Sequence, residues 1–124
     1  MKFRVLFFAL LLALISSNSL SAATFTWTGA SNNDWNEQLN WSIGDGSDGN
    51  DGYPGSNLPT LDVVIINAGN PQVNISVTTG NVTINAGNLT IANGITLDID
   101  GNIDIDGTLT FATSSSTCDV LGNW

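Results

Sequence analysis

The sequence predicts an all-β protein, organised as a parallel β-helix (solenoid) with an aromatic N-terminal cap. From Leu61 onward, apolar and polar residues alternate with period two, and most of the apolar ones are β-branched. Glycines recur at positions 80, 87, 94, 101 and 107, so each short strand is followed by a tight corner. Three such faces make one turn of roughly 21 residues, which is within the range of compact solenoid repeats.

Residues 1–23 have the organisation of a secretory signal peptide. Lys2 and Arg4 precede an apolar run at positions 5–15, and small residues follow, with cleavage expected between Ala23 and Thr24. A membrane anchor is the alternative, but the run is shorter than the roughly 20 residues that a membrane-spanning helix needs. We therefore expect an extracellular or cell-surface protein with no membrane span once the signal is removed.

Composition excludes several classes of function. Lys2 and Arg4 are the only basic residues, the chain has no His, and eleven acidic residues give a formal net charge of −9. A mature chain without cations cannot neutralise phosphates, which excludes nucleic-acid binding. It also lacks the His or Lys on which most nucleophilic catalysis depends, so we expect no enzymatic activity. The single Cys118 excludes a disulfide framework, and we favour a buried apolar residue over a thiol whose partner lies outside this chain.

Residues 24–60 are expected to form a Trp-rich cap followed by a loop rich in Gly and Asp. Trp27, Trp35 and Trp41 lie within fifteen positions of one another, and we favour a role for them in closing the first turn of the core. Stacking of these indole rings on sugars is the alternative.

The acidic loop is a candidate calcium site. Asp45, Asp48 and Asp51 carry the hard oxygen ligands that Ca²⁺ prefers. Their spacing does not match the EF-hand pattern, and we favour a solvated loop without a bound ion. No cofactor is required by the sequence, and Ca²⁺ is the only candidate.

Residues 61–124 are expected to form the turns of the solenoid, and shifting the sequence against itself predicts their register. Three offsets place apolar residues on apolar residues: 21 for Val82 and Ile84 on Ile103 and Ile105, 22 for Val73, Ile75 and Val77 on Ile95, Leu97 and Ile99, and 20 for Leu89 and Ile91 on Leu109 and Phe111. The segment holds little more than two turns, whereas solenoids usually need about three. We therefore expect a truncated fragment whose partner is the remainder of a longer chain.

The same register places acidic residues over neutral ones, with Asp98 over Ser76, Asp104 over Thr83 and Asp106 over Asn85. This arrangement would avoid like charges on neighbouring strands. We favour an acidic outer face that limits aggregation. The alternative is that carboxylates among Asp98, Asp100, Asp104 and Asp106 act as a pair in glycoside hydrolysis.

Several motifs together suggest a family. Thr26-Trp27-Thr28-Gly29, Asp34-Trp35-Asn36 and Asn40-Trp41-Ser42 are followed by Leu58-Pro59-Thr60 and Asp62-Val63-Val64-Ile65-Ile66. This string resembles the N-terminal region of large secreted bacterial surface proteins with β-helical repeats, many of them adhesin-like. A weaker likeness is to the G8 domain, which is also extracellular.

The resemblance implies a structural or adhesive scaffold whose partners are extracellular glycans or cell-surface components. Two alternatives remain open. One is a fragment of a β-helical carbohydrate-active enzyme, and the other is a Ca²⁺-dependent carbohydrate-binding module that uses the acidic loop and the tryptophans.

Overall fold

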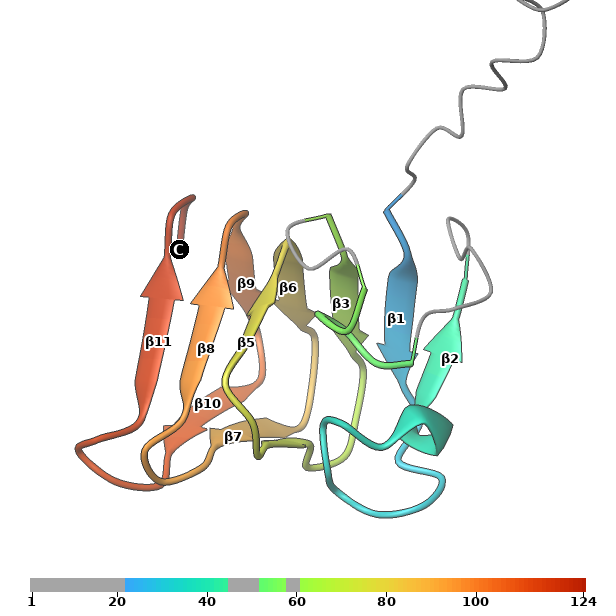
Figure 1. Ribbon diagram of the computed structural model, residues 1–124, viewed down its shortest axis with the longest axis horizontal. Helices are drawn as coiled ribbons and strands as arrows, with labels where there is room; N and C mark the ends of the chain where they lie inside the picture. Colours follow the sequence, from blue (N-terminus) through green and yellow to red (C-terminus); the bar gives the residue numbers. More distant parts are fainter. Residues whose placement is uncertain (1–21, 45–51, 58–60) are drawn as a thin grey trace, which may run out of the picture.

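The computed structural model describes residues 22–44, 52–57 and 61–124, and within them the protein is all-β apart from one short 3₁₀ helix, η1 (Gln38–Asn40) (Figure 1). The strands are β1 (Thr24–Trp27), β2 (Trp41–Ile43), β3 (Val63–Ile66), β4 (Gln72–Val73), β5 (Val77–Thr79), β6 (Asn81–Ile84), β7 (Asn88–Ile91), β8 (Thr96–Ile99), β9 (Ile103–Ile105), β10 (Thr108–Phe111) and β11 (Thr117–Val120). The expected all-β class is confirmed.

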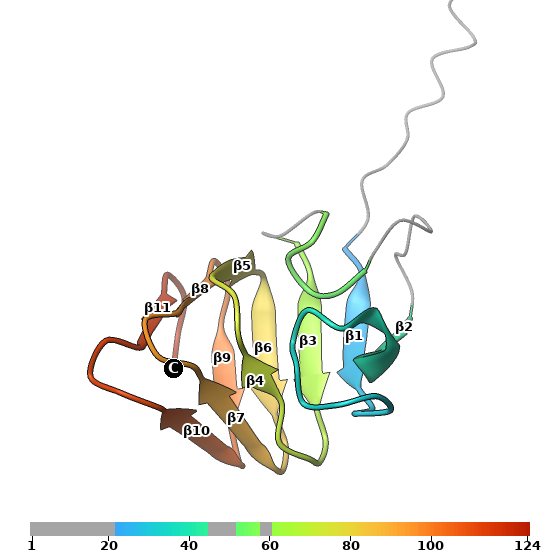
Figure 2. The same ribbon diagram turned by 60° about the horizontal axis from the view of Figure 1, so that its bottom comes forward.

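The strands form three sheets, with orders β2-β1-β3-β6-β9, β10-β7-β4 and β11-β8-β5. From β3 onward, every pairing joins a strand to the third strand after it in the chain, and all of these pairings are parallel. The only antiparallel pair among the described strands is β1 with β2. The three sheets face a common interior, with β1 and β2 at one end and β9, β10 and β11 at the other (Figure 2).

Two of the three predicted offsets are confirmed. Val82 and Ile84 pair with Ile103 and Ile105, which is the offset of 21. The offset of 20 is found between β7 and β10, where Leu89 pairs with Leu109 and Ile91 pairs with Phe111.

The offset of 22 is wrong. Val77 pairs with Leu97 and Thr79 pairs with Ile99, so the true offset on this face is 20. Val73 lies in a different sheet, opposite Ile91, because the chain turns a corner between β4 and β5. Thr79 takes the inward position that the prediction assigned to an apolar residue. It is fully buried, and its hydroxyl donates a hydrogen bond of 3.4 Å to the carbonyl of Asp62.

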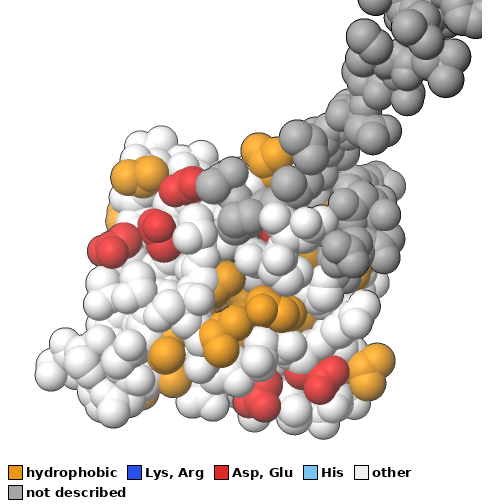
Figure 3. Space-filling model, viewed as in Figure 1, with side chains coloured by type: hydrophobic (Ala, Val, Ile, Leu, Met, Phe, Trp, Pro, Cys, Tyr) orange, Lys and Arg blue, Asp and Glu red, His pale blue; other side chains and the backbone are white. Residues whose placement is uncertain are grey.

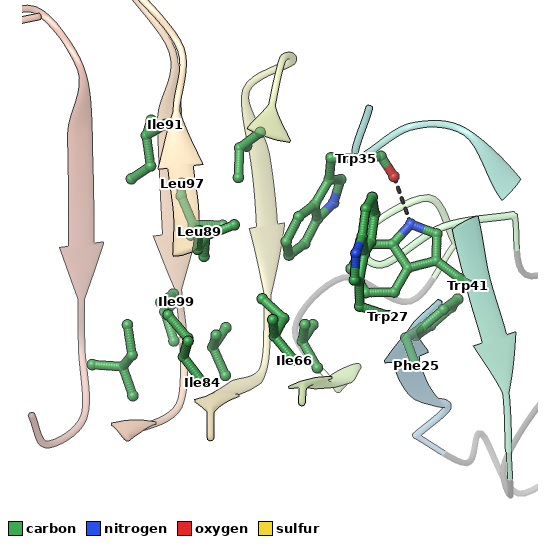
Figure 4. Close-up of a cluster of buried hydrophobic side chains, with 14 of the residues drawn as sticks. Phe25, Trp27, Trp35, Trp41, Ile66, Ile84, Leu89, Ile91, Leu97 and Ile99 are labelled. Carbon is green, nitrogen blue, oxygen red and sulfur yellow. Dashed lines mark hydrogen bonds between the residues drawn. The ribbon is translucent and has the colours of Figure 1, made fainter. Parts of the chain in front are cut away.

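Side chains from all three sheets fill one hydrophobic core. Its fully buried members include Val64, Ile66 and Ile84 from the first sheet, Val73, Leu89 and Ile91 from the second, and Leu97 and Ile99 from the third (Figure 4). Burial of each such side chain contributes about 1.5–3 kcal/mol. Because the three sheets share this core, the inner face of each sheet is buried only when the other two sheets are in place.

A column of glycine and asparagine residues forms one corner of the fold. The backbone N–H of Asn102 donates to Asn81 Oδ1 at 2.8 Å, and the N–H of Asn123 donates to Asn102 Oδ1 at 2.8 Å. The preceding glycine, Gly101, must be glycine, because a Cβ there would overlap Asn81 Oδ1. Three Gly-Asn pairs, at 80–81, 101–102 and 122–123, follow one another at intervals of 21 residues, so this corner repeats strictly.

The N-terminal block is joined to this framework through backbone and side-chain bonds. Ala23 is buried, and its carbonyl accepts a 2.8 Å hydrogen bond from Val63 N–H just before β1 pairs with β3. The segment 52–57 is held by the buried Asp62, whose Oδ2 accepts the Gly55 N–H at 2.8 Å. The first turn of strands is therefore covered by residues that precede it in the sequence.

Candidate functional site

An aromatic cluster closes the N-terminal end of the core. Trp41 lies at its centre, with the ring of Trp35 at 4.8 Å, that of Trp27 at 5.0 Å and that of Phe25 at 6.2 Å, all edge to face (Figure 4). Trp41 Nε1 donates to the Trp35 carbonyl at 2.7 Å, and Trp35 Nε1 donates to the Pro54 carbonyl at 2.9 Å. These contacts orient the rings toward one another and toward the first strands.

The three indole rings have little exposed surface. Trp35 is 0 % exposed, Trp41 is 6 % exposed and Trp27 is 7 % exposed, and all three belong to the hydrophobic core. Stacking on a sugar requires an open ring face, and the cluster leaves none on these three side chains. The edge of Trp27 differs from the other two, because it borders a hollow on the surface.

The predicted calcium loop cannot be placed, because Asp45, Asp48 and Asp51 lie outside the described residues. Within the described ranges, no group of three or more acidic or cysteine side chains is arranged to hold a metal ion. The predicted signal peptide also lies almost entirely outside them. Of the residues at the predicted cleavage site, Ala23 is buried in the core and Thr24 begins β1.

The predicted acidic positions are divided between two sheets. Asp104 on β9 pairs with Thr83, as expected. Asp98 on β8 pairs with Thr78 instead of Ser76, which is a consequence of the two-residue error on that face. No strand pairing includes Asp106 with Asn85, since both lie just beyond their strands.

The expectation that no two carboxylates would be neighbours is wrong at one place. Asp98 pairs directly with Asp119 on β11, so two acidic side chains lie on adjacent strands, about 4.8 Å apart along the hydrogen-bonding direction. Like charges in this arrangement are destabilising. Shifting the sequence against itself by 21 residues places Asp98 on Asp119, so the pair can be found from the sequence alone.

Asp98 also lines a shallow hollow of about 250 Å³ on the outer face of β5 and β8, together with Ser76, Val77, Thr78 and Thr96. We call it the Asp98 hollow. No second carboxylate is among these lining residues. The Asp98–Asp119 pair is thus the one place, in the part of the chain that the structure describes, where two acids are paired in register.

Cys118 lies between these acids in sequence but faces the core. It is half-buried and packs against the hydrophobic cluster, opposite Leu97. Burial raises the pKa of the thiol to about 11, and the negative charges of Asp119 and Asp98 contribute to the increase. At neutral pH the thiol is therefore protonated, which makes it a poor nucleophile and a poor metal ligand.

The two ends of the strand stack differ. The N-terminal end is closed by the aromatic cluster, whereas β9, β10 and β11 are the outer strands of their sheets at the C-terminal end. Apolar side chains are exposed there, with Phe111 at 45 %, Leu121 at 77 % and Trp124 at 69 %. We call these three strands and side chains the open end.

The remaining surface carries both apolar and acidic side chains: Leu39 is 69 % exposed and Leu61 is 43 % exposed, and Figure 3 shows a group of apolar side chains near the middle of the face. On the face shown in Figure 3, acidic side chains lie in separate groups, and no described residue is Lys, Arg or His. Comparison of the chain with family models, curated proteins and solved structures finds no match. Among the described residues, no helix has the length and apolar character needed to cross a membrane.

Proposed function

We propose that the chain is an exported β-helical segment of a bacterial cell-surface or secreted protein, with a structural or adhesive role. The observation that carries this proposal is the pairing of every strand from β3 onward with the third strand after it, always in parallel. A chain that coils in this way gains length without changing its cross-section, which suits a stalk or scaffold.

Three further features support the proposal. The aromatic cluster closes one end only, so additional turns of the same kind fit at the open end. The outer face carries acidic residues and no base, which keeps such a stalk from associating with itself. The tryptophan motifs resemble those that precede the repeats of adhesin-like surface proteins.

Export is tested by expressing the whole chain in a bacterium and fractionating the cells. We expect a processed form outside the cytoplasm that reacts with antibody on unpermeabilised cells or in the medium. A matched variant, Leu11→Arg, interrupts the apolar run and should remain unprocessed inside the cell. An unprocessed wild-type chain in the cytoplasm would contradict the proposal.

A scaffold role is tested by binding and by activity. Beads coated with the exported chain should adhere to cell surfaces or extracellular material, and the purified chain should release no reducing ends from polysaccharides. Loss of adhesion after the beads are blocked with antibody to the chain would support a direct contact. Equal adhesion by uncoated beads would contradict it.

The second candidate function is that of a fragment of a carbohydrate-active enzyme, and the Asp98–Asp119 pair is the observation in its favour. Glycosidases use two carboxylates whose separation determines the stereochemical outcome. Under this alternative the chain releases reducing ends, and Asp98→Asn or Asp119→Asn abolishes the release. Under the scaffold proposal neither the chain nor these variants have activity.

A further inference from the structure

A second hollow lies where the N-terminal cap meets the corner between β3 and β4. Its volume is about 270 Å³, and its lining includes Trp27, Gly29, Asn33, Gly69 and Asn70. We call it the Trp27 hollow. Only Trp27 among these residues is buried, so the indole ring forms the floor and the other residues form the rim.

The indole N–H of Trp27 is the distinctive group in this hollow. The corresponding N–H groups of Trp35 and Trp41 donate to carbonyls at 2.9 and 2.7 Å. The N–H of Trp27 makes no hydrogen bond to a residue within the ranges that the structure describes, although the side chain is only 7 % exposed. Trp27 Nε1 is not among the buried side-chain atoms that lack a partner, so the N–H reaches the surface at the hollow, where a ligand can accept it.

Two glycines keep the donor accessible. A Cβ built on Gly29 would lie 3.1 Å from Trp27 Nε1, and one built on Gly69 would lie 2.9 Å from the same atom. Both glycines have positive φ, +60° and +84°, a conformation that other residues rarely adopt. A side chain at either position would cover the indole edge, and the sequence has none.

The chemistry of the rim selects the type of ligand. Asn33 and Asn70 are exposed at the rim, and each carries an amide that can donate and accept hydrogen bonds. No charged side chain lines the hollow, and the net charge of −9 repels anions. A cation would need an open face of the indole, and the Trp27 side chain is only 7 % exposed. The ligand is therefore uncharged and rich in hydroxyl groups.

We infer that the Trp27 hollow binds a single neutral sugar residue through the edge of the indole ring. A hydroxyl oxygen of the sugar accepts the Trp27 N–H, and the amides of Asn33 and Asn70 bind neighbouring hydroxyls. The hollow has a volume of about 270 Å³, slightly smaller than the roughly 300 Å³ of the smallest pockets for drug-sized ligands, so it holds no more than one sugar ring. This mode differs from stacking, because the ring faces remain in the aromatic cluster.

This inference rests on the proposed function: if the chain is adhesive, a neutral sugar is the class of ligand to which it adheres. The binding itself is measured on the purified chain, which separates the two. Failure of export would overturn the proposed function and leave sugar binding in vitro unaffected. Failure of sugar binding would leave a scaffold without this ligand.

The test is a titration of ¹⁵N-labelled protein followed through its indole N–H signals, which are four because the chain has four Trp. The probes are glucose, galactose, mannose and N-acetylglucosamine, each to tens of millimolar. We expect at least one of them to shift the Trp27 signal saturably. The buried signals of Trp35 and Trp41 should remain in place, and the exposed Trp124 reports non-specific effects in the same sample.

Variants establish the site. The double change Asn33→Ala and Asn70→Ala should weaken binding at least tenfold, while Thr108→Ala, an exposed change on β10, should leave it unchanged. Gly29→Asn should abolish binding, because Asn tolerates positive φ and its side chain would cover the donor. Thermal unfolding curves identify any variant that is not folded, and such a variant is not scored.

The inference is overturned if none of the four sugars moves the Trp27 signal. It is also overturned if the Trp124 signal moves in parallel with it, or if the double variant binds as tightly as the original chain. Glucosamine and glucuronate, which are charged, serve as negative controls. Tighter binding of either charged sugar than of the neutral ones would contradict the assignment of ligand class.

Discussion

Replacement of Gly101 by alanine tests the glycine–asparagine column at its middle glycine. A Cβ at this position would overlap Asn81 Oδ1 and would lie 2.9 Å from the carbonyl oxygen of Gly80. Gly101 is not among the glycines with positive φ, so the cost arises from this contact and not from backbone strain. The neighbouring turn of the chain has to move away to make room for the methyl group.

The loss in free energy of unfolding can be estimated from the hydrogen bonds that this movement breaks. The Gly101 N–H donates to the Gly80 carbonyl at 3.0 Å, and the Asn102 N–H donates to Asn81 Oδ1 at 2.8 Å. Each of these bonds contributes about 1 kcal/mol to stability. Crowding in a packed region adds about 1–3 kcal/mol. Because some relaxation will occur, we expect Gly101→Ala to lower the free energy of unfolding by about 2–4 kcal/mol.

Urea unfolding followed by far-ultraviolet circular dichroism measures the change, and the chain supplies a matched control. Gly94 has φ of +71°, and a Cβ there would meet no atom within 4 Å, so Gly94→Ala incurs only the backbone cost of about 1–2 kcal/mol. Asn81→Ala removes the overlapping group, and combining it with Gly101→Ala should destabilise less than the sum of the two single changes. Strict additivity, or a smaller effect for Gly101→Ala than for Gly94→Ala, would refute the reasoning.

Three other predictions address the core, the acidic pair and the N-terminus. Trp35→Ala should lower the free energy of unfolding by about 3–5 kcal/mol, because the ring is fully buried and carries a hydrogen bond, and calorimetry at several scan rates measures it. The pKa of Cys118 is raised from 9.0 to about 11, so the contribution of this thiol to stability should be constant below pH 9 and should be lost as the pH rises from 9 toward about 11. Asp119→Asn should lower this pKa, as followed by thiolate absorbance, and an unchanged pKa would mean that Asp119 does not act on the thiol. A chain that begins at Thr24 should be less stable by about 1 kcal/mol than one that begins at Ala23, because the acceptor of the Val63 N–H is lost. Equal urea midpoints for the two chains would contradict this.

The all-β class and most of the register could be predicted from the sequence because strand residues have a strict period of two. Val82 and Ile84 face inward and pair with Ile103 and Ile105, at an offset of 21. Simple alternation favours every even offset, so a match at an odd offset is informative about the register. The prediction failed between Val73 and Val77, where alternation continues through a corner. Periodicity alone does not show that the chain bends there, and a buried threonine, Thr79, looks polar unless its acceptor is known.

The sites were less predictable, for two physical reasons. The aromatic cluster could be expected from three nearby tryptophans, but which indole N–H has a partner depends on carbonyls far away in sequence, such as that of Pro54. The Asp98–Asp119 pair can be read from an offset of 21, but the three offsets that predict the register extend no further than Phe111 and so do not include β11. The Trp27 hollow depends on the approach of Gly69 to the cap, which has no sequence signature beyond the glycine itself.

The central claim is that strands pair with the third strand after them and not with their neighbours, and engineered disulfides test it directly. In a Cys118→Ser background, Thr83→Cys is combined with Asp104→Cys, which the parallel register places opposite it, or with Thr90→Cys, which a hairpin of β6 and β7 would place opposite it. Neighbouring strands lie within the Cα separation of about 4.4–6.8 Å that a disulfide requires. We predict rapid oxidation of the 83–104 pair and none of the 83–90 pair, as measured by mass spectrometry. The opposite result would show an antiparallel meander and would contradict the claim.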